Sequence, residues 1–155
     1  MLADYVVDQK GLNWPTLLSP WAWLLPNELT VWIVNRLGDI FVVRDDGSVH
    51  MMDVGRGTFE QVALNRDEFA DLADQDQNAE DWFAIPIVDE LVRSGMTLEP
   101  GQCYSYRTLP IIGGSYEIGN FRVLTLEEHY KTFGPIQQAL KDVPDGASVR
   151  FTTDG

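Results

Sequence analysis

The chain has 155 residues, of which 45% are hydrophobic and 11% aromatic, so it can bury one core and is not disordered. Its 24 acidic residues against 11 basic ones give a formal net charge of −13 at pH 7. This charge repels phosphate backbones, which disfavours DNA or RNA as a partner, and it attracts basic proteins. The alternative interpretation is an acidic surface that only keeps the protein soluble.

The N-terminal residues and the single cysteine predict a cytoplasmic protein. Met1–Lys10 contains Asp4 and Asp8 and lacks the basic segment of a secretory signal. Cys103 has no cysteine with which to form an internal disulfide, which suits a reducing compartment. The most apolar stretch, Trp21–Pro26, is too short to span a bilayer, so no membrane partner is expected.

Residues 1–28 are expected to form a helical lead-in that packs on the core of a domain spanning residues 29–155. Prolines break its helical pattern at three places, and burial of its tryptophans would anchor it to the rest of the fold. The tryptophans are Trp14, Trp21 and Trp23.

Four short strands are predicted next, because β-branched and aromatic runs alternate with turn residues. Asp45–Asp46–Gly47 supplies the chemistry of a hairpin, and Gly55–Arg56–Gly57 that of a second turn. Strands joined by such short turns form an antiparallel meander. The expected strands are Thr30–Val34, Asp39–Val43, Ser48–Met52 and Thr58–Ala63.

Helical patterns follow the meander. Asn65, with Glu68 three residues later, predicts a capped helix whose apolar stripe holds Phe69, Leu72 and Ala73. A second helix is expected to end near Arg93, before Gly95. Pro86 would lie in its first turn, and its inward residues would be Ile85, Val88, Leu91 and Val92.

The last third mixes strands with a third helix. Strands are predicted at Gln102–Thr108, Phe121–Leu124 and Ser148–Thr152. Thr125 and Glu128 form a capping box that begins the helix. Its apolar stripe is Leu126, Tyr130, Phe133, Ile136 and Leu140, with an interruption at Gly134–Pro135. The chain therefore belongs to the α+β class, a meander sheet packed against a few helices in a single domain.

Catalytic, metal and phosphate sites are not supported by the residue patterns. Cys103 lies in a strand, whereas an activated thiol usually lies at a helix N-terminus, and His129 borders an apolar stripe where structural histidines are common. His50 has no histidine partner at a metal-binding spacing. Gly113–Gly114 is expected to be a turn or a close backbone approach. We therefore expect no enzyme activity, no cofactor and no metal.

An acidic segment stands out after the meander. Seven carboxylates fall within the fifteen residues 67–81, which contain no arginine and no lysine. They could form the solvated side of a helix and its following loop, or a negative surface that enters a basic groove of a partner. The candidate partner-binding residues are Asp67, Glu68, Asp71, Asp74, Asp76, Glu80 and Asp81.

The C-terminal half resembles a known family. The motifs that carry the resemblance are, in chain order, Leu98–Tyr104, Gly113–Tyr116, Asn120 and Glu128–Tyr130. This order is similar to the C-terminal domain of immunity proteins against DNase toxins of the type VI secretion system. Two earlier blocks, Trp32–Asp39 and Asp46–His50, also fit the opening meander of that family, so the resemblance runs from about Leu25 to Phe151.

The resemblance implies a bacterial α+β protein, related in architecture to the SMI1/KNR4-type immunity fold, that binds and neutralises a cognate toxin. It departs from the family in having only a short lead-in before the meander. The positions carried over from the family pattern are Gln102, Tyr104, Gly113, Gly114, Tyr116, Asn120 and His129. For the glycines and tyrosines, a structural role is expected over toxin contact.

Three functions remain open from the sequence. The first is an immunity protein that binds a basic toxin such as a nuclease. The second is a regulatory or scaffold module that binds a cellular protein unrelated to toxins. The third is a small-ligand binder or thiol enzyme that uses the region of Cys103 and His129. The oligomeric state and the toxin itself have no signal in the sequence.

Overall fold

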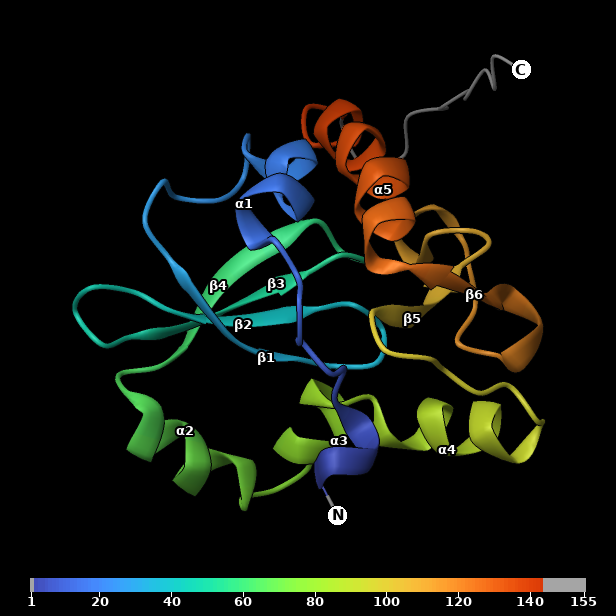
Figure 1. The fold of residues 1–155 in the computed structure, drawn as a ribbon, viewed down its shortest axis with the longest axis horizontal. Coiled ribbons are helices and arrows are strands. Elements are labelled where there is room, and N and C mark those ends of the chain that lie inside the picture. The colour runs from blue at the N-terminus through green and yellow to red at the C-terminus, as the bar shows by residue number, and fades with distance from the viewer. Residues whose placement is uncertain (1, 144–155) are drawn as a thin grey trace.

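The computed structural model describes residues 2–143 and shows a mixed α+β fold, as predicted (Figure 1). Within that range, five α-helices accompany two antiparallel sheets. The strands are β1 (Thr30–Val34), β2 (Ile40–Val43), β3 (Val49–Asp53), β4 (Thr58–Ala63), β5 (Gln102–Tyr106) and β6 (Phe121–Thr125). The helices are α1 (Trp14–Leu17), α2 (Arg66–Ala73), α3 (Asn78–Trp82), α4 (Ile85–Arg93) and α5 (Leu126–Leu140). Four 3-10 turns are η1 (Leu2–Tyr5), η2 (Ser19–Trp21), η3 (Pro110–Ile112) and η4 (Ile118–Asn120). The predicted strand at Ser148–Thr152 lies outside the described residues.

The four predicted strands of the meander are confirmed, in the order β1-β2-β3-β4. The hairpin between β2 and β3 forms as expected, because Gly47 takes a φ of +85° and the Asp46 carboxylate accepts a hydrogen bond from Ser48 N at 2.9 Å. Across the hairpin, Ile40 pairs with Met52. These local turn residues therefore set the register of the sheet.

The meander has a packed core on each of its faces. On one face, Ile40 and Met52 join the larger core with residues of β5, β6 and α5. On the other face, Phe41 packs edge-on against Phe69 of α2, with ring centroids 5.2 Å apart. Figure 1 accordingly shows α1 and α5 above the sheet and α2, α3 and α4 below it. The sheet is thus the middle layer of the fold.

The second sheet is the two-stranded ribbon of β5 and β6, in which Cys103 pairs with Leu124. Its connection to the meander is direct, because Tyr104 N donates to the Arg36 carbonyl at 2.8 Å. The predicted capping box begins α5, with Glu128 N donating to the Thr125 hydroxyl at 3.1 Å. Helix α5 then packs across the ribbon and contacts η2 near the N-terminus.

The helices between the sheets differ from prediction in two ways. The short helix α3 follows α2, and α4 begins after Ala84, which takes a left-handed φ of 50°. Val92 was expected to face inward and is exposed instead, whereas Ile87 is buried beside Val88 and Leu91. The apolar stripe of α4 is centred about one residue away from the predicted one, so Val92 lies beyond its edge.

Helix α5 runs without a break through Gly134–Pro135, where the predicted apolar stripe is interrupted. Pro135 removes one backbone donor but lies on the exposed side, and the buried residues Phe133 and Gln137 hold both flanks in place. Gly134 is needed for packing, because a Cβ there would lie 2.5 Å from the Pro20 carbonyl oxygen. Tertiary contacts therefore override the local break signal.

The N-terminal segment packs on the core through its tryptophans. Trp21 is fully buried, and Trp14 and Trp23 are half-buried against the same core. Residues 6–9 run along the outer side of β1, where Val7 N donates to the Val34 carbonyl at 2.8 Å. None of the helices in residues 2–143 combines the length and the apolarity that a bilayer span requires.

Candidate functional site

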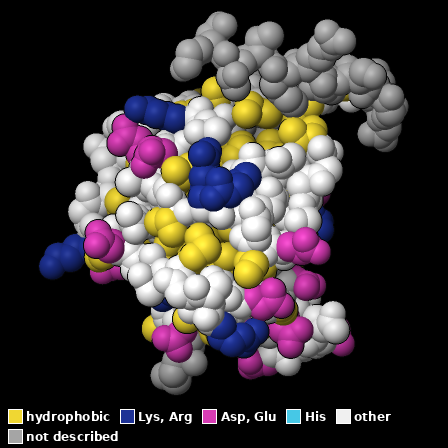
Figure 2. Space-filling view, turned by 90° about the vertical axis from the view of Figure 1, so that its right-hand side faces the viewer, with side chains coloured by type: hydrophobic (Ala, Val, Ile, Leu, Met, Phe, Trp, Pro, Cys, Tyr) yellow, Lys and Arg dark blue, Asp and Glu magenta, His cyan; other side chains and the backbone are white. Residues whose placement is uncertain are grey.

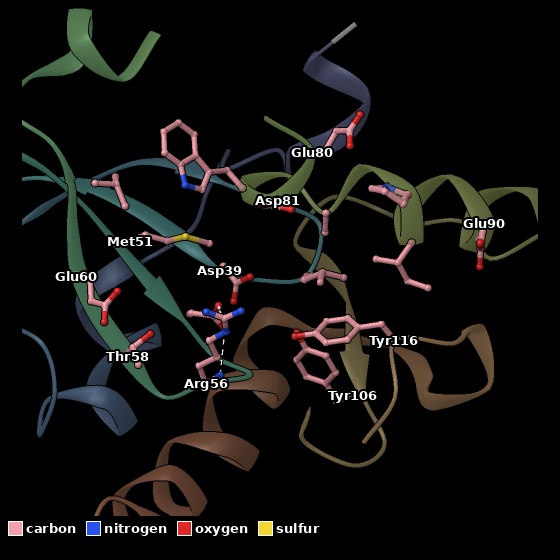
Figure 3. Close-up of a pocket in the computed structure, with 17 residues that line it drawn as sticks. Asp39, Met51, Arg56, Thr58, Glu60, Glu80, Asp81, Glu90, Tyr106 and Tyr116 are labelled. Atoms are coloured by element: carbon pink, nitrogen blue, oxygen red, sulfur yellow. Dashed lines mark hydrogen bonds and ion pairs between the residues drawn. The ribbon is translucent and has the colours of Figure 1, made fainter. Parts of the chain in front are cut away.

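A cleft of about 610 Å³ opens between the meander, the junction of α3 with α4, and the connection from β5 to β6. Antiparallel pairing brings Met51 beside Glu60 and Asp53 beside Thr58 at its floor. The left-handed backbone at Ala84 turns the chain between Trp82 and α4 to form one wall. Figure 3 shows β4 on one side of the cleft, α4 on the other, and Tyr116 at its rim.

The charged residues of the cleft are almost all acidic. Six carboxylates face one guanidinium, that of Arg56. Arg56 is mainly exposed, and its Nε lies 3.8 Å from the Asp53 carboxylate. The cleft therefore keeps an excess of negative charge that attracts cations. Its acidic residues are Asp39, Asp53, Glu60, Glu80, Asp81 and Glu90.

Asp39 is the buried carboxyl of the cleft, only 4% exposed. Its oxygens accept hydrogen bonds from Val54 N at 2.9 Å and from the Asn35 amide at 3.1 Å. Burial raises the pKa of Asp39 well above its ordinary value, and the nearby Asp53 charge raises it further, against the lowering effect of these hydrogen bonds. Burial also raises the pKa of Asp53, whereas the hydrogen bond from Arg56 N lowers it.

Two tyrosines of the cleft, Tyr106 and Tyr116, also have raised pKa values. Their rings meet edge-on, with centroids 6.2 Å apart, and Figure 3 shows both at the cleft. Burial raises the pKa of Tyr106 well above its ordinary value, and the charge of Asp39 adds to the effect. Tyr116 is about half exposed, and its partial burial also raises its pKa, with a further contribution from Asp53. Further negative charge in the cleft is disfavoured, and a cation would relieve the repulsion.

The structure distributes the seven candidate acids of the acidic segment over two places. Glu80 and Asp81 line the cleft. Asp67, Glu68 and Asp71 lie on α2, and Asp74 and Asp76 lie in the connection from α2 to α3. Glu68 also has a structural role, since its carboxylate accepts from Leu64 N at 3.2 Å while its own N–H donates to Asn65.

Cys103 and His129 meet in the core and not in the cleft. Both are fully buried, and both lie against Gly38, where a Cβ would be 2.7 Å from His129 Nε2 and 3.4 Å from Cys103 Sγ. The His129 Nδ1 pairs with the Ser105 hydroxyl at 2.7 Å. Burial raises the pKa of the Cys103 thiol far above its ordinary value and lowers the pKa of His129 to about 3. This neutral, enclosed pair is the opposite of an activated thiolate.

The other family-pattern positions mostly support the fold. Gln102 accepts from Glu99 N at 2.9 Å, and the Tyr104 hydroxyl donates to the Met96 carbonyl at 2.6 Å. A Cβ on Gly114 would lie 1.9 Å from the Thr108 carbonyl oxygen, so the expected close backbone approach is confirmed. Gly113 ends η3 with a φ of +100°, and Asn120 bonds the backbone of the same loop. Tyr116 is the exception, because it is exposed and lines the cleft.

A metal site has no support in the geometry. Among residues 2–143, no three His, Cys, Asp or Glu side chains cluster as metal ligands would. His50 lies on β3 and stacks on Phe59 with ring centroids 5.0 Å apart. The Gly55–Arg56–Gly57 segment forms the predicted turn, with Gly57 N donating to the Asp53 carbonyl at 2.8 Å.

Comparison with known proteins identifies part of the chain. Residues 63–137 match the family described as T6SS immunity protein Tdi1, C-terminal. This confirms the resemblance of residues 98–130 to the C-terminal domain of type VI secretion immunity proteins, whereas the DNase nature of the toxin stays a prediction. No curated protein matches the chain.

The match to the Tdi1 C-terminal family extends from the end of β4 into α5. It covers the whole acidic segment and all seven family-pattern positions. It begins after β1, β2 and β3, so the resemblance of Trp32–Asp39 and Asp46–His50 stays a prediction, as does the SMI1/KNR4-like architecture. The cleft is formed jointly by the matched segment and the meander that precedes it.

Several cleft residues were not singled out from the sequence as candidate site residues. Asp39, Asp53 and Glu60 are isolated acids in the sequence and meet only through strand pairing and the β1–β2 turn. Glu90 is on the outer side of α4, where a carboxylate is ordinary. One signal was available for Asp53 and Glu60, because a short turn at Gly55–Arg56–Gly57 pairs the two flanking strands, and this pairing places both acids on one face of the meander.

Proposed function

We propose that this protein binds and neutralises a basic toxin of the type VI secretion system in the bacterial cytoplasm. The observation that carries the proposal is the acidic cleft, which lies partly within the segment that matches an immunity-protein family. A nuclease is the toxin class that fits best, because a protein that grips nucleic acid must present a basic surface. An acidic cleft can take the place of the phosphates on such a surface.

The shape and chemistry of the cleft support a protein partner. Five of its six carboxylates, all except the buried Asp39, are spread over β3, β4, α3 and α4, so they can meet several basic side chains of a partner together. The lining of the cleft includes Trp82 and Tyr116, and aromatic side chains of this kind are enriched at protein interfaces. Steering by the overall negative charge would speed the encounter.

Catalysis by the Cys103 and His129 region finds no support. A nucleophilic thiol needs a lowered pKa and access to substrate, whereas the Cys103 thiol is buried with a raised pKa. His129 has a lowered pKa and pairs with Ser105 inside the core. The pair instead fills the space beneath Gly38.

Co-expression with the product of the neighbouring gene tests the proposal. We expect that product to be toxic alone, to be harmless with this protein, and to copurify with it in a complex whose affinity falls as salt rises. If this protein neither relieved the toxicity nor formed a complex, the proposal would be wrong. A complex with a non-toxic protein would instead favour the regulatory module.

A charge-reversal series then locates the acidic surface that contacts the toxin. Asp71, Asp74 and Asp76 changed together to Lys test the α2 side, and Glu80 and Asp81 changed to Lys test the cleft. Each set should slow association about tenfold or more if its surface faces the toxin. Glu28, Glu99 and Glu127 changed to Lys form the control, because all three are exposed and lie on other elements. An association rate that falls equally in the control would show that overall charge alone acts.

A further inference from the structure

The loop that joins β5 to β6, residues 107–120, exposes apolar side chains in an unusual way. Ile111 is 55% exposed, Tyr116 51% and Ile118 43%. Ile112 is also exposed, so four of the large apolar side chains that the described surface exposes lie within eight residues. Figure 2, which faces the right-hand side of Figure 1, shows hydrophobic side chains gathered on this face with charged groups around them. Contiguous apolar surface of this kind marks interaction sites.

The backbone of the loop is held in place. The Asn120 amide accepts from Thr108 N at 2.9 Å and donates to the Thr108 and Ser115 carbonyls at 2.9 and 2.8 Å. Leu109 is buried and anchors the start of the loop in the core. Gly114 N donates back to the Leu109 carbonyl at 3.0 Å. The isoleucines are therefore presented by an ordered loop, which lowers the entropic cost of binding.

The loop and the acidic cleft form one continuous surface. Tyr116 belongs to the loop, lines the cleft, and packs edge-on against the buried Tyr106. Arg107 and Arg122 are exposed at the base of the loop and do not line the cleft. An apolar centre with a strongly acidic flank fits a partner that presents apolar residues beside basic ones.

We propose that the 107–120 loop is the apolar anchor of the toxin interface, with Ile111 and Ile118 inserting into the toxin while its basic residues enter the adjacent cleft. This rests on the proposed function. The acids would then set the association rate, and the isoleucines would set how slowly the complex dissociates. The acidic face of α2 would lie outside the central contact.

Binding to the neighbouring gene's product, in a catalytically inactive form, tests the anchor. Ile111→Ser with Ile118→Ser should weaken affinity about 30-fold or more, mainly through faster dissociation. The matched control is Leu2→Ser with Leu64→Ser, because both leucines are more than half exposed and lie on other elements. The control should bind within about twofold of the wild type.

The outcomes separate this inference from the proposed function. If the wild type binds and the isoleucine double variant binds equally well, the anchor is overturned while the proposed function stands. If the wild type does not bind the inactive toxin, both are overturned. Urea unfolding of each variant shows that the fold is intact, and Ile111→Ser alone decides the matter if the double variant unfolds.

Discussion

The turn at residues 35–39 and the loop at residues 107–120 are built in opposite ways. The turn buries polar groups: Asn35 and Asp39 are almost wholly enclosed, and the Asn35 amide bridges Asp39 and the Trp82 carbonyl at 3.1 and 2.9 Å. The loop instead exposes Ile111 and Ile118 to solvent. Buried polar groups whose hydrogen bonds are all formed help to specify a fold, whereas clustered exposed apolar groups mark a surface that binds a partner. The first region is structural, and the second is where we expect recognition.

The turn joins every layer of the molecule. The Tyr130 hydroxyl of α5 donates to the Gly38 carbonyl at 2.8 Å, and Tyr104 N of β5 donates to the Arg36 carbonyl. The loop, by comparison, is bonded mainly to itself through Asn120. Changes in the turn should therefore unfold the whole protein, and changes in the loop should act locally.

The largest effect is expected for Gly38→Ala. Gly38 has a φ of +83°, and its Cβ would fall 2.6 Å from the ring of the fully buried His129. The strained backbone and the overpacked core together should cost about 3 kcal/mol of unfolding free energy, measured by urea denaturation. Gly47→Ala is the matched control, because Gly47 has a φ of +85° with open space around it, and it should cost about 1 kcal/mol. Equal losses would show that the packing of the turn is unimportant.

The next effect is a loss of stability on mild acidification. Unfolded histidine binds a proton below its ordinary pKa of about 6.5, whereas burial lowers the pKa of His129 to about 3. His129 therefore contributes stability that is present above about pH 6.5 and is lost as the pH falls toward 3. Between pH 7 and pH 5 this loss amounts to about 2 kcal/mol.

Asp39 acts in the opposite sense over part of the same range, since its raised pKa lets the folded state bind a proton before the unfolded state does. Because Asp39 titrates in both proteins, comparing the pH dependence of stability of the wild type with that of His129→Gln isolates the contribution of the histidine. That variant should lose about 2 kcal/mol less than the wild type between pH 7 and pH 5, by urea unfolding at each pH. Parallel pH profiles would place His129 in a solvated environment.

A smaller effect is expected for Gly114→Ala in the loop. A Cβ there would overlap the Thr108 carbonyl, so the loop must shift and weaken the bonds of Asn120. We expect about 1 kcal/mol of lost stability, with faster amide exchange confined to residues 107–120. Gly119→Ala, in the same loop with nothing near its Cβ, should leave both measurements unchanged. Global unfolding by Gly114→Ala would remove the distinction between the two regions.

Local signals account for the parts of the fold that could be predicted. The capping box of Thr125 and Glu128 and the Asn65 cap each join residues only three positions apart, and both form as expected. The strands β1 and β4 have the predicted bounds because their β-branched runs end at turn residues. The need for glycine at position 134 could not be predicted from local signals, because it depends on the Pro20 carbonyl approaching Gly134 from the other end of the chain.

The candidate site was less accessible to prediction for the same physical reason. The acidic segment is contiguous in sequence, yet only Glu80 and Asp81 reach the cleft. The other four carboxylates of the cleft come from the β1–β2 turn, β3, β4 and α4, and only the folded chain brings them together. No periodic sequence pattern marks residues that line a cleft. Tyr116 was noted as a family-pattern position, but its place between the loop and the cleft depends on the docking of β5 and β6 onto the meander.

The N-terminal segment protects the edge of the meander against pairing with strands of other molecules. Strand β1 is the first strand of the meander, and residues 6–9 cover part of its open side: Val6 bridges to Asn35, and the Gln9 amide donates to the Trp32 carbonyl at 3.0 Å. An uncovered outer strand is a template on which another chain can add. A chain trimmed to begin at Lys10 would present these backbone groups to neighbours, and its first defect would be strand-to-strand aggregation.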